Sequence, residues 1–331
     1  MAMDATVSSA RVAETPAARA LRIGFGALWL LDAVLQAQPG MFHMDMVSTV
    51  MQPAATGQPA WLASTIAWSI GVVSPHVATF NALIVALQAM IGVLLLMGHR
   101  PRAVRAGAVL ALIWALAIWL FGEGLGQLLT GSATGLNGAP GSALVYAAGA
   151  GLLLAQRGDD LCIAGRSLAT WLVAGLFALS VALQLNPLFF QPLGLASVFG
   201  QSAGMAQPRI VALPLVWLAN ASGARPVLVN AVAVALLAAA ALAAPWTAHG
   251  RVGQALLGAL TLFLLAEWWL GQDFGMPFGG MATDPNTAVP VALLLVAGYL
   301  ADRDRVGRAR ACAGRAEHVP TQSVAIGSQG A

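Results

Sequence analysis

Eight long apolar segments follow one another along the chain, and this pattern restricts the fold more than any other feature. Roughly 20 mostly apolar residues are needed for a helix to cross the hydrocarbon core of a bilayer. Only 9% of the residues are charged, against about 25% in a typical soluble protein, so the chain cannot build a water-facing surface around these segments. The sequence therefore predicts an all-α, polytopic integral membrane protein. The expected spans are Leu21–Gln36, Ala78–Gly98, Ala106–Gly122, Ser142–Gln156, Leu168–Leu185, Pro226–Pro245, Val252–Gly271 and Thr287–Leu300.

Two further apolar stretches, Trp61–Val73 and Ile210–Leu218, are too short to span a bilayer comfortably. Each contains tryptophan, which favours the headgroup region of a membrane. We therefore expect both stretches to form helices that lie at the interface or re-enter the bundle.

The positions of the basic residues indicate how the spans are oriented. All 16 basic residues are arginine, a bias that we attribute to a GC-rich bacterial genome. With eight spans, 14 of the 16 fall on the side that holds both termini, and only Arg209 and Arg225 fall on the other. Cytoplasmic loops carry an excess of basic residues. The sequence therefore predicts a multi-pass protein of the bacterial plasma (inner) membrane with both termini in the cytoplasm.

The two halves of the chain match each other at a shift of 148–149 residues. Residue types that rarely match by chance recur at this offset, in the pairs Gln36/Gln184, Pro39/Pro187, Asn81/Asn230 and Trp119/Trp268. Because each half holds an even number of spans, the duplication is a parallel repeat. The predicted parts are a disordered cytoplasmic N-terminus (1–18), a first four-helix repeat (19–157), a cytoplasmic linker (158–167), a second four-helix repeat (168–302) and a basic, disordered cytoplasmic tail (303–331).

Two apolar runs and a turn in the first repeat are similar to a known family. The runs are Leu21–Trp29 (LRIGFGALW) and Gln88–Gly98 (QAMIGVLLLMG), and the short turn Arg100–Arg102 follows them. In these features the repeat resembles the DoxX-like superfamily of four-helix membrane proteins, which includes the DoxD subunit of thiosulfate:quinone oxidoreductase and the methylamine-utilisation protein MauE. The resemblance implies a four-helix bundle that is an accessory or subunit of a quinone-linked membrane oxidoreductase. Many DoxX-like proteins have an acidic residue in the second helix, where this chain has Gln88.

Ionisable and polar residues at membrane depth are costly to bury and are therefore candidates for function. In the first repeat they are Asp32 and Gln36 in the first span, Gln88 in the second, and Glu123 at the outer end of the third. Asp32 and Gln36 are four residues apart and so share a helix face. We predict that Asp32 and Glu123 are catalytic and that Gln36 and Gln88 bind a cofactor in a polar cavity. The alternative is that these groups lie near the outer interface and are hydrated.

The second repeat has neutral residues at three of these positions, in the pairs Asp32/Ser180, Gln88/Leu237 and Glu123/Gln272. Conversely, Glu267 and Asp273 of the second repeat align with Ile118 and Gly124. A duplicated scaffold needs its packing residues twice but its chemistry only once. We therefore expect the functional cavity to lie in the first repeat and to open to the outer face.

An external segment offers a different kind of site. Met41, His43, Met44 and Met46 lie within six residues on the predicted outer side. Thioether and imidazole groups suit copper, and thioethers select Cu(I). These four residues are therefore candidate copper ligands. The alternative is an interfacial loop with a methionine-lined apolar face.

Three functions remain open on the sequence alone. The first is a DoxX-like accessory or subunit of an oxidoreductase, with a quinone as its cofactor and subunits of a membrane redox complex as its partners. The second is a copper-handling membrane protein, and the third is a small-solute transporter with Asp32 and Glu123 along its path. The lipid bilayer is a partner in all three. The arginines are scattered among loops, so nothing indicates nucleic-acid binding, and the residues leave open whether the protein is an enzyme.

Overall fold

The computed structural model describes residues 14–155, 162–163, 166–205 and 207–317, and most of them are helical. The all-α class predicted from the sequence is confirmed. Within these ranges the strand pair β1 (Cys162–Ile163) and β2 (Arg166–Ser167) is antiparallel. The helices are α1 (Pro16–Gln36), α2 (Gln52–Ala55), α3 (Ala60–Val73), α4 (Val77–Leu96), α5 (Pro101–Phe121), α6 (Ser142–Ala155), α7 (Leu168–Gln184), α8 (Gly194–Ala203), α9 (Arg209–Ala224), α10 (Pro226–Ala243), α11 (Gly250–Leu270) and α12 (Ala288–Glu317).

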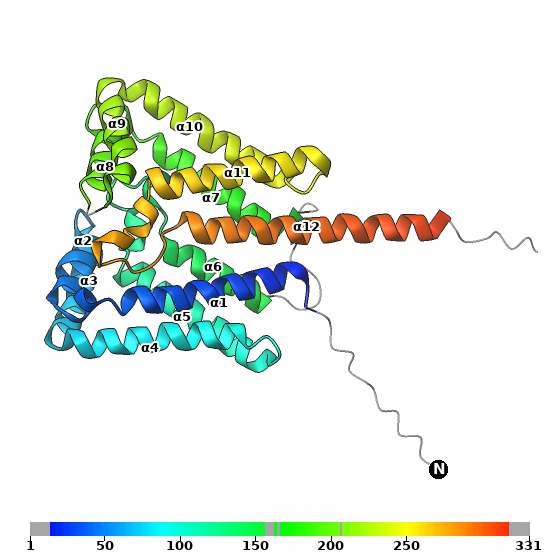
Figure 1. Cartoon of the computed structure of the whole chain (residues 1–331), viewed down its shortest axis with the longest axis horizontal. Coiled ribbons are helices and arrows are strands. Elements are labelled where there is room, and N and C mark those ends of the chain that lie inside the picture. Colours follow the sequence, from blue (N-terminus) through cyan, green and yellow to red (C-terminus); the bar gives the residue numbers. More distant parts are fainter. Residues whose placement is uncertain (1–13, 156–161, 164–165, 206, 318–331) are drawn as a thin grey trace, which may run out of the picture.

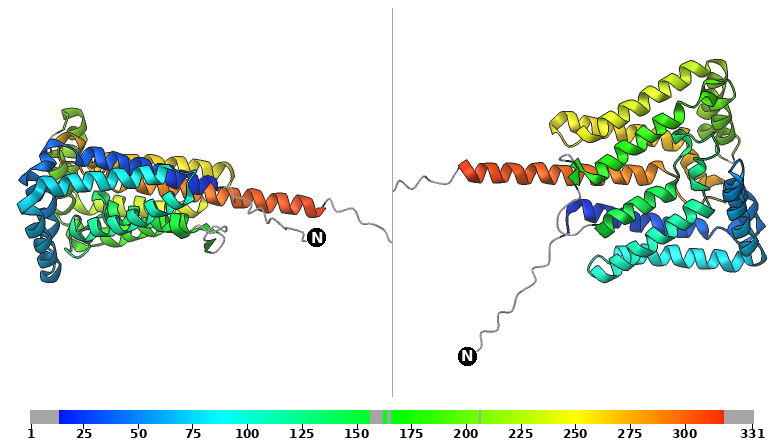
Figure 2. Two further views of the ribbon diagram at one scale, coloured as in Figure 1. Left: turned by 90° about the horizontal axis from the view of Figure 1, so that it is seen from below. Right: turned by 180° about the vertical axis from the view of Figure 1, so that it is seen from behind.

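The long helices run side by side, and the shorter ones lie across one end of the bundle (Figure 1). Helices α1, α4, α5, α6, α7, α10, α11 and α12 share one approximate direction, whereas α2, α3, α8 and α9 lie across the left end of the view. The further views in Figure 2 show the same arrangement. α1 begins and α12 ends at the opposite end of the bundle, so the described ends of the chain lie on one side.

The exterior of the bundle is that of a membrane protein. Among the described residues, four helical stretches are long and apolar enough to cross a membrane: Ala60–Leu96, Pro101–Phe121, Pro226–Trp246 and Gly250–Leu270. Large apolar side chains on them face outward, including Leu83, Ile113, Leu242 and Leu262. A helix that is apolar on all sides must be buried in protein or face lipid, and these side chains are not covered by protein. They face the bilayer.

The helices α3 and α9 lie where the sequence predicted interfacial or re-entrant helices. α3 and α4 form one apolar stretch, but the short turn η3 (Ser74–His76) lies between them and the two helices point in different directions (Figure 1). Trp61 and Trp68 of α3 and Trp217 of α9 are exposed. Exposed tryptophan at the end of an apolar bundle is the pattern of a membrane interface.

One interhelical contact occurs in the same form in both halves. Gln36 donates from Nε2 to Asn81 Oδ1 at 2.6 Å, and Asn81 donates from Nδ2 to the Gln36 backbone carbonyl at 3.0 Å. Gln184 and Asn230 make the same two bonds at 2.6 and 3.1 Å. All four side chains are buried. Each pair joins its first and second long helix and satisfies the amide groups of both residues.

A second shared contact shows where the halves differ in length. Trp119 donates from Nε1 to the Pro140 carbonyl at 2.8 Å, and Trp268 donates in the same way to Pro285 at 2.6 Å. The two residues are 21 apart in the first case and 17 in the second. The loop before α12 is therefore four residues shorter than the loop before α6, and residues after it correspond at a shift of 145 rather than 149. The shift of 148–149 residues predicted from the sequence therefore does not continue beyond this loop.

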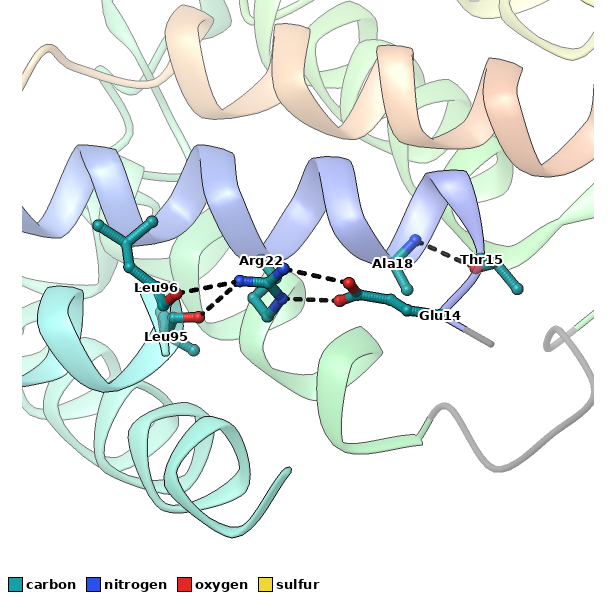
Figure 3. A network of polar contacts seen from close by, with 6 residues as sticks. All are labelled: Glu14, Thr15, Ala18, Arg22, Leu95 and Leu96. Carbon is teal, nitrogen blue, oxygen red and sulfur yellow. Dashed lines mark hydrogen bonds and ion pairs between the residues drawn. The ribbon is translucent and has the colours of Figure 1, made fainter. Parts of the chain in front are cut away.

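Arg22 joins the start of α1 to the end of α4 (Figure 3). Its Nη1 donates to the carbonyls of Leu95 at 3.1 Å and Leu96 at 3.5 Å, and its Nε pairs with Glu14 Oε1 at 2.7 Å. The last carbonyls of a helix have no partner within the helix, so Arg22 caps α4. Residues 14–18 thus belong to the bundle, although the sequence predicted disorder over 1–18; residues 1–13 lie outside the described ranges.

The far end of the chain also differs from the prediction. α12 continues as a helix to Glu317, where the sequence predicted a disordered tail from residue 303, and it extends beyond the other helices (Figure 1). Apolar periodicity ends near residue 300, but arginine and alanine are good helix formers and prolong a helix that is already nucleated. Residues 318–331 lie outside the described ranges, as do 156–161 and 164–165 of the linker region.

Candidate functional site

A cavity of about 310 Å³ lies within the first half of the chain. Its walls come from α1, α3, α4, α5 and α6, and part of the loop before α12 closes one side. Most of the lining is apolar and aromatic, and none of the lining residues is basic. The aromatic lining residues are Trp29, Phe80, Trp114, Phe121 and Tyr146.

Asp32 lies inside this cavity and is buried. The Tyr146 hydroxyl of α6 donates to Asp32 Oδ1 at 3.2 Å. The Tyr146 ring is held edge-on by Trp29 and Phe25, with ring centroids 5.0 and 5.4 Å away. Packing fixes the tyrosine, and the tyrosine orients the carboxyl group. A functional side chain is expected to have its orientation fixed by packing and hydrogen bonds in this way.

Glu123 lies in the loop after α5, at the outer end of the same cavity. Its Oε1 accepts from Ser142 Oγ at 2.8 Å and from the Ala143 amide at 3.0 Å, which caps the start of α6. Its Oε2 is buried and has no hydrogen-bond partner. Burial raises the pKa of the Glu123 carboxyl to about 7, and the nearby Asp284 carboxylate contributes.

The two glutamines predicted to bind a cofactor have different surroundings. Gln36 lines the cavity, but its amide is already bonded to Asn81, so its role is structural. Gln88 is buried with 4% of its surface exposed, and its Oε1 has no partner. Gln88 therefore keeps an acceptor free to bind a ligand.

Three residues that line this cavity each have one buried polar atom without a hydrogen-bond partner. These atoms are Gln88 Oε1, Trp114 Nε1 and Glu123 Oε2. Buried polar atoms almost always have a hydrogen-bond partner, and an exception needs an explanation such as a bound molecule. Two of these atoms accept hydrogen bonds and the indole N–H donates one. A ligand that satisfied all three atoms would have to donate two hydrogen bonds and accept one.

A third carboxyl group, Asp284, enters the site from the second half of the chain. Asp284 and Thr283 line the cavity, and the Asp284 carboxylate interacts electrostatically with both Asp32 and Glu123. Sequence reasoning missed this residue. The gapless match between the halves pairs Asp284 with Gly135, and loop residues carry no periodicity that would place them over the opposite half.

The cavity adjoins a larger vestibule of about 740 Å³ at the end where the short helices lie. Glu123, Ser142, Thr283 and Asp284 line both spaces. The vestibule wall also includes residues of α8 in the second half, such as Ser197 and Gln201. The carboxyl groups of Glu123 and Asp284 therefore stand between the vestibule and Asp32.

The four predicted copper ligands are not brought together. Met41 and Met46 are buried in an apolar cluster with Val47, whereas His43 and Met44 are exposed. Among the described residues, no group of three or more histidine, cysteine or acidic side chains could hold a metal ion. The geometry favours the alternative of an apolar methionine face, and copper binding stays a prediction from the sequence.

Glu267 and Asp273, the acidic residues that the sequence comparison of the halves singled out in the second half, lie elsewhere. Neither Glu267 nor Asp273 lines the cavity or the vestibule. Asp273 is buried with an unpartnered Oδ1, and burial raises its pKa to about 6. Its backbone has a φ of +47°, in the left-handed region where its counterpart Gly124 also lies. A positive φ favours glycine, so aspartate at this position strains the turn.

Comparison of the chain with known protein families, with curated proteins and with solved structures finds no significant match. The site must therefore be interpreted from its own geometry.

Proposed function

We propose that this protein is a DoxX-like subunit or accessory of a quinone-linked oxidoreductase in the bacterial plasma membrane, and that its first half binds the head group of a quinol or quinone. In this proposal the chain is a tandem duplication with eight spans and both termini in the cytoplasm. The cavity then opens to the outer face through the vestibule.

The observation that carries the proposal is the set of unpartnered atoms Gln88 Oε1, Trp114 Nε1 and Glu123 Oε2 in an aromatic cavity. A benzoquinol has a flat apolar ring that stacks on aromatic side chains. Each of its two hydroxyl groups both donates and accepts a hydrogen bond. It can therefore satisfy the two acceptors and the indole donor together. An organic cation fits the carboxyl groups but offers nothing to the Trp114 N–H.

The residues of this chain have separate roles toward such a ligand. Trp29 stacks against the ring, Gln88 and the Trp114 N–H fix its orientation, and Asp32, oriented by Tyr146, accepts a proton or hydrogen bond. The quinol supplies electrons, which pass to the redox partner, so this chain contributes binding and proton acceptance rather than redox chemistry.

Binding of a decyl-substituted benzoquinol to the purified protein in lipid nanodiscs tests this function. Titration of tryptophan fluorescence should show saturable binding. Asp32→Asn should weaken the affinity about fivefold, because a typical hydrogen bond contributes about 0.5–1.5 kcal/mol. Gln88→Leu should weaken it about fivefold through loss of a neutral hydrogen bond.

Ser180→Ala is the matched control, since Ser180 occupies the position of Asp32 in the second half. Its hydroxyl donates to the Leu176 carbonyl within its own helix at 2.9 Å, and the variant should bind the benzoquinol like the unmodified protein. Equal affinity in all the proteins, or no saturable binding, would contradict the proposal.

The proposed topology has its own test. A reporter enzyme that is active only after export, fused behind Ala331, should stay inactive. The same reporter inserted between Ser202 and Gly204, at the end of α8, should be active. Activity at Ala331 would show that the termini are outside or that the number of spans is odd.

A further inference from the structure

The loops that precede α6 and α12 each cross to the opposite half of the chain. Thr134, in the first loop, donates to Gln184 Oε1 of α7 at 2.6 Å. Gly131 in the same loop accepts from Asn186 Nδ2 at 2.8 Å. In the second loop, Thr283 and Asp284 lie at the cavity of the first half. Each half is therefore completed by a segment of the other.

The crossing brings different residues to the two equivalent places. Asp284 arrives beside Asp32, whereas its counterpart Gly135 arrives beside Ser180. Any side chain at Gly135 would collide with Ser180, so the loop closes directly over that serine. At the cavity of the first half, the Asp284 side chain lies where Gly135 makes this close contact in the second half.

Two hydrogen bonds hold the Asp284 side chain in place. Its Oδ1 accepts from the Asn286 amide at 2.7 Å and its Oδ2 from Thr283 Oγ1 at 2.9 Å. Both bonds come from its own loop and fix the carboxylate in place. The other titratable groups that face it are Asp32 from α1, Glu123 from the loop after α5 and Tyr146 from α6, and none of them is basic.

We propose that Asp284 is a ligand-binding residue supplied by the second half, and that it shares with Glu123 the single hydrogen that the outward hydroxyl of a bound quinol donates. A second, independent feature of the site points to a ligand, because Gln88, which lines the same cavity, is 4% exposed and its buried Oε1 has no hydrogen-bond partner. The inference rests on the proposed function and adds a specificity. The end of the cavity where Asp284 and Glu123 lie should bind the reduced ligand more tightly than the oxidised one. A quinone carries no hydroxyl hydrogens, so carboxylates can accept nothing from it and repel its carbonyl oxygens.

The test compares benzoquinol with the corresponding benzoquinone. Asp284→Asn keeps an oxygen for the bond from the Asn286 amide and removes the charge. It should weaken quinol binding about tenfold, as expected for a hydrogen bond to a charged group. Quinone binding should stay the same or strengthen. Asp45→Asn is the control, because Asp45 is an exposed carboxylate outside the cavity. It should change neither affinity.

The outcomes separate the two proposals. If the unmodified protein binds both ligands and Asp284→Asn weakens both equally or neither, Asp284 only shapes its loop and the inference is wrong. If the unmodified protein binds neither ligand, the proposed function is wrong. In that case the position of Asp284 is still tested by its neighbour: removal of the Asp284 charge should move the pH midpoint of Glu123 titration, followed by infrared spectroscopy of the carboxyl band, to lower pH. An unmoved midpoint would overturn the assignment of Asp284 to the cavity mouth.

Discussion

The surroundings of Asp32 in the first half and of Ser180 in the second are built on the same scaffold but hold different chemistry. The Gln36–Asn81 pair and the Gln184–Asn230 pair have the same two hydrogen bonds, within 0.1 Å. The polar residues around Asp32, by contrast, are neutral or absent around Ser180, in the pairs Asp32/Ser180, Gln88/Leu237, Glu123/Gln272 and Asp284/Gly135. Residues that hold helices together are kept twice, and residues that could act on a ligand are kept once.

The pair Glu123/Gln272 separates these two roles at a single position. Gln272 Oε1 accepts from the Ala288 amide at 2.8 Å, as Glu123 Oε1 accepts from the Ala143 amide at 3.0 Å. The cap at the start of the fourth long helix is thus common to both halves. The cap does not need a charge, because the neutral Gln272 makes it as well. We therefore assign the charge of Glu123 to the function of the cavity.

The largest effect should come from converting the first site into the second. A variant with Asp32→Ser, Gln88→Leu, Glu123→Gln and Asp284→Gly carries at each position the residue that the other half already accommodates. It should fold, and its affinity for benzoquinol should fall more than about 100-fold, because several hydrogen bonds are lost together. Binding titration checks the affinity and size-exclusion chromatography checks the fold. A folded variant with unchanged affinity would show that the four residues that differ between the halves do not bind the ligand.

Glu123→Gln alone should change how stability depends on pH. The pKa of Glu123 in the folded protein is about 7, above its ordinary value of 4.5. Between these values the folded state holds a proton that the unfolded state has released, so stability falls as the pH rises through this window. Glu123→Gln lacks this loss and keeps the cap. Asp273 titrates in both proteins, so the difference between their stabilities at each pH reports on Glu123 alone.

Thermal unfolding from about pH 5 to about pH 8 measures this difference. The variant should gain stability relative to the unmodified protein as the pH rises. A difference that is constant, or that shrinks with rising pH, would mean that Glu123 is hydrated in the folded state.

The smallest effect should be the same in both halves. Asn81→Leu and Asn230→Leu each break one interhelical amide pair, and each should lower stability by about 1 kcal/mol, as is typical of such bonds in membranes. Thermal unfolding of the two variants side by side checks the equality. If Asn81→Leu is clearly more damaging to stability, the two halves do not share one scaffold.

The sequence predicted the helical class and the two helices that lie across the bundle end, because apolar length and tryptophan content are local properties. It also identified Asp32, Gln88 and Glu123, since a polar residue inside an apolar run is visible without a structure. It missed Asp284 and the four-residue difference between the loops, because both depend on how a loop crosses to the other half. The role of Gln36 was also beyond the sequence: only its bonds to Asn81 distinguish packing from ligand binding.

The number of benzoquinol molecules bound per chain at saturation tests the central claim most directly. The measurement uses the protein in nanodiscs, with binding to empty nanodiscs subtracted. The account predicts one molecule per chain, because the cavity lined by Gln88, Trp114 and Glu123, each with an unpartnered buried polar atom, and by three carboxyl groups lies in the first half. Two molecules per chain would show that both halves are binding sites despite their different residues, and none would show that the cavity serves another purpose.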